Sequence, residues 1–409
     1  MKWLGLGVLL LIWPGSSSAQ VRSEGMAGAG SAMLDGLDAA CVNPARLAVS
    51  GRPCIRLVGT WAEIANNSFS LADYRAYNGA DLTERDKEKL LAHIEEGEGL
   101  EGHGAVSAEG PGLCVRGWAI GVRGRGSAVG VVPKDLFVLI LNGNTLGRTF
   151  RFDDADGSGD LLGELYVGHG RTIKLPWGFP VAVGASVKYL RGWLHEEVRE
   201  ASGTIRTDPD HIQGEGTVRA RHSTGGNGLG IDLGVYGDIA RSWSAALSLR
   251  DLFGHVNWKD GNKRTTARVR LRESTLRGLK NGEELVETKH ETEQIGAFRT
   301  SIPPVMTAGV SRAVGRFCLV ADCTQGFGES SLTTRTPRLS VGTEARLLPA
   351  FRGRAGISFG GRDGRSLALG MGLTPGPIRM DLSISARGGL VPLMGRGIGA
   401  GFSLSMLFK

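Results

Sequence analysis

The chain has 409 residues, of which 64 are glycine, 41% are hydrophobic and 6% are aromatic, and its formal net charge is +7. This length suits two or three ordinary domains or one long β-barrel, and so much glycine argues against a helical enzyme, because glycine suits tight turns and crowded sheet faces. The basic residues are spread along the chain rather than clustered, so we expect no nucleic-acid partner.

The first 19 residues have the pattern of a secretory signal peptide. Lys2 supplies the positive start, Trp3 to Trp13 form the apolar run, and Ser17-Ser18-Ala19 offers a small-residue cleavage site. The residue after the expected cut is Gln20 rather than cysteine, so a lipoprotein anchor is not indicated. No later segment reaches the ~18 apolar residues that a membrane-spanning helix needs. The sequence therefore predicts an exported protein without such a helix.

The next segment, residues 20–50, is rich in glycine and alanine and has no clean period of 2 or 3.6. It cannot bury a face of its own, but small residues allow it to thread a confined space. Near its end, Pro44 fixes its own φ and pushes Asn43 out of the helical region, so we expect a sharp turn there. Asn43 carries both a donor and an acceptor. A simple loop joining the signal to the first strand is the alternative.

A first strand is expected at Cys54–Trp61, followed by a polar region near residues 66–104. Thr83 and Asp86 in this region have the spacing of a capping box, which predicts a short helix that covers one mouth of a barrel. A second short segment, Pro133–Leu141, is very apolar. It fits a helix, in the lumen or at the membrane interface, and a buried strand equally well.

From Phe179 onward, apolar and polar residues alternate with period 2. Val181, Val183 and Val187 share one face, whereas Gly184, Ser186 and Lys188 share the other. The segments are near the length of about 10 residues that a tilted transmembrane strand needs. A polar face of Gly, Ser, Arg and Asp suits a barrel interior, with the apolar face toward lipid. A soluble sandwich would also alternate, but its buried face normally carries more aromatic residues.

Two long polar stretches interrupt the alternation, at residues 196–222 and 260–300, and are predicted to be extracellular loops or strand extensions. Five tryptophans fall near expected strand ends, where an aromatic girdle would lie: Trp61, Trp177, Trp193, Trp243 and Trp258. The sequence predicts an all-β, antiparallel transmembrane barrel of about 14 strands over residues 51–409, with short helical inserts.

The N-terminal sequence Gly25-Met26-Ala27-Gly28-Ala29, together with Asn43-Pro44-Ala45, resembles the signature of the FadL-like outer-membrane transport family. The resemblance implies that residues 20–50 form a plug in the barrel lumen, with Gly25, Gly28, Gly30, Asn43, Pro44 and Ala45 as its motif. Arg46 follows the motif where the family usually has a small residue. The final strand, with Phe402, Leu404, Met406 and Phe408 on one face, resembles the signal read by the barrel assembly machinery.

Family likeness further implies residence in a Gram-negative outer membrane, contact with its lipid, and a passive channel for small hydrophobic molecules such as long-chain fatty acids. A non-transporting barrel that serves secretion or envelope structure is the alternative. No cofactor is expected. A Gly-x-Ser-x-Gly match at Gly356–Gly360 does not indicate a hydrolase, because no histidine follows it: the last one is His290.

A metal site is not expected, although Asp154, Asp156, Ser158 and Asp160 resemble the start of a calcium loop. The closing glutamate is one position early, so an acidic turn is the preferred interpretation.

Five cysteines are present, an odd number that leaves at least one thiol free. Cys41 and Cys54 could form a disulfide in an oxidising compartment. Cys318 and Cys323 have odd spacing, so on one strand they would point to opposite faces.

Overall fold

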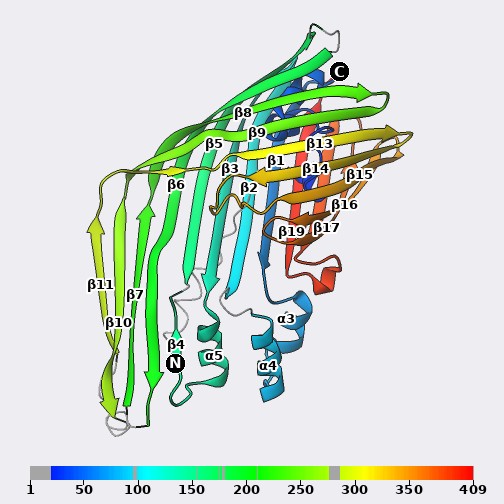
Figure 1. Cartoon of the computed structure of the whole chain (residues 1–409). Helices are drawn as coiled ribbons and strands as arrows, with labels where there is room; N and C mark the ends of the chain where they lie inside the picture. The colour runs from blue at the N-terminus through cyan, green and yellow to red at the C-terminus, as the bar shows by residue number, and fades with distance from the viewer. Residues whose placement is uncertain are drawn as a thin grey trace.

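Fourteen antiparallel strands close into one β-barrel, because the last strand, β19, pairs along its length with β1 (Figure 1). The computed structural model describes residues 20–94, 99–153, 155–174, 176, 180–209, 211–275 and 286–408, with the backbone alone for 272–275. The expected signal peptide and Trp177 lie outside the described residues. Closure gives the wall no free edge, which is what a barrel in lipid requires.

The strands of the barrel follow one another around the wall in chain order. They are β1 (Cys54–Asn66), β2 (Leu100–Val115), β3 (Trp118–Val132), β5 (Asp156–Lys174), β6 (Pro180–Thr207), β8 (Gly225–Ala240), β9 (Trp243–Asp260), β13 (Val305–Val314), β14 (Phe317–Gly326), β15 (Arg338–Leu348), β16 (Phe351–Gly360), β17 (Arg365–Leu373), β18 (Ile378–Arg387) and β19 (Gly397–Leu407). At one end, the short-turn end, neighbouring strands meet in tight turns such as residues 116–117 and 315–316. The other end carries the long connections and is called the loop end.

The predicted alternation separates the two faces of the wall. Val187 is 55% exposed on the outside, whereas its neighbour Lys188 is 2% exposed and points into the lumen. Leu247 and Ser248 make the same contrast on β9, at 47% and 1%. The outer face is therefore apolar and the lumen polar, as the sequence predicted.

Three helices lie at the loop end (Figure 1): α3 (Leu71–Tyr77), α4 (Glu84–Ala92) and α5 (Lys134–Asn142). The capping box of Thr83 and Asp86 begins α4 as expected, and its hydrogen bonds hold the pKa of Asp86 below its usual value. Helix α3 was not predicted, although Ser70 and Asp73 cap it in the same way. Helix α5 resolves the ambiguity at Pro133–Leu141, and it packs beside α4 rather than in the lumen. None of the helices among the described residues is long and apolar enough to cross a bilayer.

The two polar stretches are mostly strand. Strand β6 is 28 residues long, and its second half extends beyond the barrel, where it pairs with β7 (His211–Ser223). Strand β7 in turn pairs with β10 (Lys263–Thr275), and β10 with β11 (Val286–Gln294). Two short strands, β4 (Thr149–Arg151) and β12 (Phe298–Ser301), join β6 and β9. These strands form a sheet that projects past the loop end (Figure 1) and is called the sheet extension.

The predicted aromatic girdle is wrong for two of its members. Trp193 and Trp243 are exposed on the outer face, but Trp61 and Trp258 are fully buried. Trp61 turns inward because β1 shifts its register between Arg56 and Val58, which reverses the alternation. Trp258 is on the inner face because it is an odd number of positions from the outward Trp243, and the two register shifts that lie between them on β9 cancel each other.

Candidate functional site

Residues 20–50, here called the inner segment, lie inside the barrel near the short-turn end (Figure 1). They form α1 (Val21–Glu24), α2 (Leu37–Val42) and a 3-10 helix, η2 (Pro44–Val49). Six of their side chains have no exposed surface at all: Met26, Ala29, Ala39, Asn43, Ala45 and Leu47. The inner segment therefore fills the lumen at this level rather than crossing it as a loose loop.

Glycines on both sides make this close fit. A Cβ on Gly356 of β16 or Gly342 of β15 would overlap Met26, and a Cβ on Gly184 of β6 would overlap the backbone of Pro44. From the other side, a Cβ on Gly25 would come within 3.1 Å of the Gly370 Cα on β17. The small residues of the segment and the glycines of the wall are two halves of one packed contact.

The Asn43-Pro44-Ala45 turn joins the inner segment to the wall. Asn43 Nδ2 donates to the backbone oxygen of Val235 on β8 at 3.2 Å, and Asn43 Oδ1 accepts from Ala45 N at 3.1 Å. Asn43 is extended, with φ −151°, and Pro44 begins η2. Arg46, which follows the turn, donates to the backbone oxygens of Met33 and Leu34 and lies over the ring of Tyr236.

Gly28 and Gly30 lie in a turn that the wall holds through charged side chains. Both have positive φ, 88° and 144°, which suits glycine. Asp322 of β14 accepts from Gly30 N, Ser31 N and Ser31 Oγ at 2.8–2.9 Å. Arg338 of β15 donates to the backbone oxygen of Ala27 at 3.0 Å. Hydrogen bonds to charged groups are among the stronger ones in proteins.

Buried ion pairs also link the inner segment to the wall. Near the short-turn end, Asp38 pairs with Arg56 of β1. On the side toward the loop end, Glu24 pairs with Arg387 of β18 at 2.7 Å. Arg387 also pairs with Glu63 of β1. All five charged groups are at most 10% exposed, so removing one member of a pair would leave a buried charge without that partner.

A second cluster of charges belongs to the wall alone. Lys188 of β6 pairs with Asp232 at 2.6 Å and with Asp251 at 2.5 Å. Asp251 reaches this position because β9 bulges, and its own φ is 55°. Asp251 connects through Arg125 to Glu164 and Arg123, so the cluster spans β3, β5, β6, β8 and β9. Opposite charges on neighbouring strands thus neutralise one another inside the lumen.

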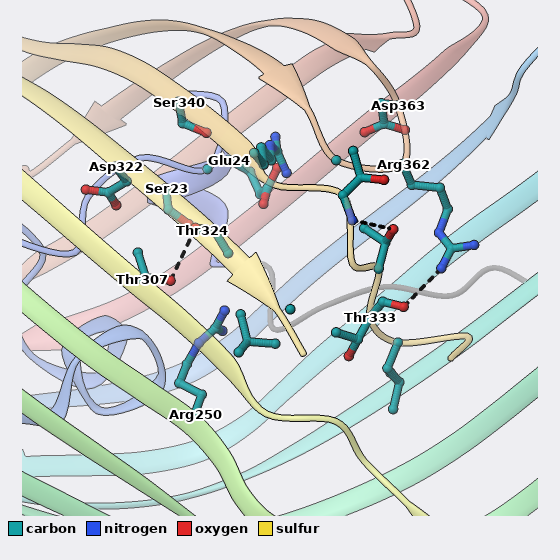
Figure 2. Close-up of a pocket in the computed structure, with 18 of the residues that line it drawn as sticks. Ser23, Glu24, Arg250, Thr307, Asp322, Thr324, Thr333, Ser340, Arg362 and Asp363 are labelled. Carbon is teal, nitrogen blue, oxygen red and sulfur yellow. Dashed lines mark hydrogen bonds between the residues drawn. The ribbon is translucent and has the colours of Figure 1, made fainter. Parts of the chain in front are cut away.

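A cavity of about 170 Å³, the inner cavity, lies between the inner segment and the loop end. Figure 2 shows Ser23 and Glu24 of the inner segment facing it, with Thr307, Asp322 and Thr324 on the wall. Eight of the lining residues carry hydroxyl groups and seven carry charged side chains. Thr307 and Thr324 hydrogen-bond each other at 3.2 Å. The apolar part of the lining includes Val42, Val305 and Leu332. The cavity can therefore surround a compact molecule and offer it hydrogen bonds.

A larger cavity of about 600 Å³, the outer cavity, lies nearer the loop end. Residues 327–337, called the partition loop, connect β14 to β15 and line both cavities. Ser331 of this loop donates to Asp160 of β5 at 2.6 Å and accepts from Ser127 of β3 at 2.7 Å. Arg362 donates to the loop's backbone at Ser330 and Thr333, the latter contact drawn in Figure 2. The partition loop therefore reaches across the lumen.

The wall itself is interrupted beside both cavities. Strand β9 pairs with β12 through residues 255–258 and with β13 through residues 243–250. Between these pairings, Ile302 N to Gly254 O at 2.8 Å is a backbone hydrogen bond that joins the two sides. Pro303 and Pro304 have no N–H to add another. On the outside of this interruption, Phe253 is 73% exposed.

The calcium candidate does not form a loop. Asp156, Ser158 and Asp160 lie within strand β5, and Asp154 is outside the described residues. Asp160 contacts Ser331 and His195 Nδ1, the latter at 2.8 Å. Within the described ranges, no three His, Cys, Asp or Glu residues gather as a metal site would require.

Sequence reasoning missed the specific partners in the lumen. It predicted a polar inner face, yet it did not identify the cluster around Lys188 or the partition loop. The parity of Lys188, Asp232 and Arg125 on their strands was the available signal, because all three fall on the polar face. Their mutual contacts depend on how neighbouring strands are staggered, which the local pattern does not contain.

A model described as a family of unknown function (DUF5723) matches residues 53–225 and 215–383. No curated protein matches the chain.

Among solved structures, a deletion mutant of the TodX monoaromatic hydrocarbon channel has a TM-score of 0.59 at 13% identity, covering 95% of this chain and 99% of that one. The P. putida toluene transporter TodX scores 0.54 at 13%, covering 95% and 98%. A Pseudomonas aeruginosa FadL homologue scores 0.50 at 13%, covering 97% and 98%. The barrel thus has the fold of FadL-like channels.

Proposed function

The chain belongs to the DUF5723 family, whose function is unknown, and we propose that it is a passive outer-membrane channel for small hydrophobic molecules. The observation that carries this proposal is the layout of the lumen. Two cavities follow each other from the loop end, and the packed inner segment separates them from the short-turn end. A passage that is open at one end and closed at the other suits a molecule that enters from outside and is then released.

The inner segment acts as the plug in this proposal. Gly25 and Gly28 bring its backbone against the wall, Gly30 donates its N–H to Asp322, and the turn at Asn43 fixes it to β8. A plug held by hydrogen bonds and glycine contacts stops the leakage of ions and water. A channel for sparingly soluble molecules does not need a water-filled pore.

The size of the inner cavity favours compact ligands. Its volume of about 170 Å³ is close to the ~150 Å³ of an engineered cavity that binds benzene. An extended long-chain fatty acid would have to lie mainly in the larger outer cavity. We therefore propose molecules of monoaromatic size, with or without a hydrogen-bonding group, ahead of long-chain fatty acids. TodX, a structural neighbour, is described as a monoaromatic hydrocarbon channel.

Release sideways into the membrane is the proposed exit. The interruption between β9 and β13 lies beside both cavities: Val305 lines the inner one and Ile302 the outer one. Few backbone hydrogen bonds would have to open there, and a hydrophobic molecule would pass directly into lipid. Movement through a displaced plug is the alternative route.

Uptake of radiolabelled toluene and of a labelled long-chain fatty acid, by cells with and without the protein, tests the proposal. We expect faster toluene entry with the native protein. Gly254→Phe should slow it, because a Cβ there would already lie 3.1 Å from the Ile302 Cβ. Gly157→Phe is the matched control, since the nearest atom to its Cβ would be 3.6 Å away. A folded barrel in the outer membrane that accelerates neither probe would overturn the channel.

Location is tested separately by cell fractionation and by gel mobility with and without heating. A folded barrel should sediment with the outer membrane and migrate differently once heated. Recovery in the soluble periplasm, with no heat-dependent mobility, would contradict the membrane assignment.

A further inference from the structure

Two cysteines face each other across the first two strands of the barrel. Cys54 begins β1 and Cys114 lies near the end of β2, and the two are direct partners in the antiparallel register. Direct partners in an antiparallel pair have Cα atoms about 4.5 or 5.5 Å apart, depending on the type of pair. Both values fall within the range of about 4.4–6.8 Å that a disulfide spans.

Both side chains also point to the same side of the wall. Cys54 and Cys114 are buried on the lumen face, in a cluster of apolar residues at the short-turn end. Because they are direct partners on neighbouring strands, their side chains leave the wall side by side, and a bond between the two sulfurs fits the existing register.

We propose that Cys54 and Cys114 are a disulfide-forming pair that closes when the chain reaches an oxidising compartment. This proposal takes the place of the Cys41–Cys54 disulfide that the sequence left possible. Cys41 lies in the same apolar cluster, but it is on the inner segment and is not a strand partner of Cys54. The proposal rests on the proposed function only in that it needs export.

The chemistry is a thiol–disulfide exchange with an oxidised protein or small-molecule disulfide as the electron acceptor. One cysteine thiolate attacks the acceptor and forms a mixed disulfide, releasing one acceptor thiolate. The second cysteine thiolate then displaces the acceptor's other sulfur. The two cysteines lose two protons and two electrons, and the acceptor becomes a dithiol or two thiols.

The position of the pair indicates what the bond would hold. Cys54 also pairs in register with Leu407 of β19, so it lies on the strand that closes the barrel. A Cβ on Gly36 of the inner segment would come 3.0 Å from Cys54 Sγ. The bond would therefore fix the first hairpin beside the closing seam and directly beneath the inner segment.

Peptide mapping tests the pair in two preparations. The first is protein from cells whose thiols are alkylated before lysis. The second is purified protein refolded from denaturant into detergent with oxidised glutathione present throughout, because the folded lumen buries both thiols. We expect a non-reducing digest to contain one peptide pair linking Cys54 to Cys114, and denatured protein to titrate two fewer thiols than its five cysteines would give. Cys114→Ser should restore the Cys54 thiol, and Cys323→Ser, on the exposed face, should leave the link intact.

The possible results test the cysteine pair and the export of the protein separately. If protein refolded with glutathione links Cys54 to Cys41, or forms no link, the proposed pair is wrong. If the link forms with glutathione but both thiols are alkylated in cells, the pair stands and the export required by the channel is contradicted. If Cys54→Ser alone fails to fold, the Cys114→Ser protein and the native digest still decide the assignment.

Discussion

Ser31 of the inner segment donates two hydrogen bonds to Asp322 of β14, one from its backbone N–H at 2.9 Å and one from its hydroxyl at 2.8 Å. With Gly30 N, three donors converge on one carboxylate. Asp322→Ala should release this turn, because each hydrogen bond to a charged group contributes roughly 1.5–3 kcal/mol. We expect the barrel to fold and its ion conductance in planar bilayers to rise.

Thr324→Ala provides the control for this change. Thr324 lies two residues further along β14, and its hydroxyl bonds to Thr307 of the wall. Its conductance should match that of the native protein. Equal conductance of the Asp322 variant and the native protein would mean that the contact does not hold the segment closed.

Gly356→Ala tests the close fit between the wall and the inner segment. The added Cβ would overlap backbone atoms of Met26, and overpacking of this kind typically costs about 1–3 kcal/mol. The segment should move, so susceptibility of residues near Met26 to added protease should increase. Gly157→Ala, in an open position on β5, should cause no such change. Protection of the segment in both variants would show that it is not packed against β16.

Removal of residues 25–48 from the inner segment should leave a folded barrel, because the backbone ladders of the strands pair only with one another. Arg56 would lose Asp38, but water entering the lumen would hydrate it. Ion leakage should increase well above that of the Asp322 variant. A deletion barrel that folds but conducts no more than the native protein would argue against a plug.

The lipid face is tested at Leu247. Leu247→Arg should reduce the free energy of unfolding in lipid vesicles by roughly 2–4 kcal/mol, if this residue lies at the bilayer midplane. Thr324→Arg places the same charge in the inner cavity, which is polar, and should cost less. Equal losses in denaturant titrations would reverse the assignment of faces.

The buried cluster around Lys188 should matter more than any surface pair. Lys188→Met removes the partner of Asp232 and Asp251, and breaking a buried pair typically costs about 3–5 kcal/mol. Arg264→Ala breaks an exposed pair with Glu293 in the sheet extension and should cost at most about 1 kcal/mol. Comparable denaturation midpoints for the two variants would show that the cluster contributes nothing specific.

The barrel could be predicted from the sequence because its signal is local. The choice of face at Val187 and Lys188 depends only on period 2, so each strand predicts its own orientation. Trp61 was placed in the girdle by its position near a strand end, and that prediction is wrong. A register shift three residues earlier turns its side chain inward, and the sequence pattern does not reveal such a shift.

The site itself could be predicted only in outline. Glycines and Asn43 marked the inner segment, but Asp322 lies 291 positions from Ser31, and only closure of the barrel brings them together. The partition loop has the same polar composition that a loop in water would have. Because the lumen is also polar, composition does not distinguish a loop that folds inward from one that stays outside.

The sheet extension has a consequence for the molecule's behaviour among its own copies. Strand β11 lies at the outer side of the extension (Figure 1), and all nine of its residues are exposed. An outermost strand offers backbone groups to which a strand of another molecule could add, and aggregation can begin there. Glu287, Lys289 and Glu291 place alternating charges along this border. A second molecule whose β11 approached in register would meet like charges. We therefore expect that this strand does not pair with a strand of another copy, even in a crowded membrane.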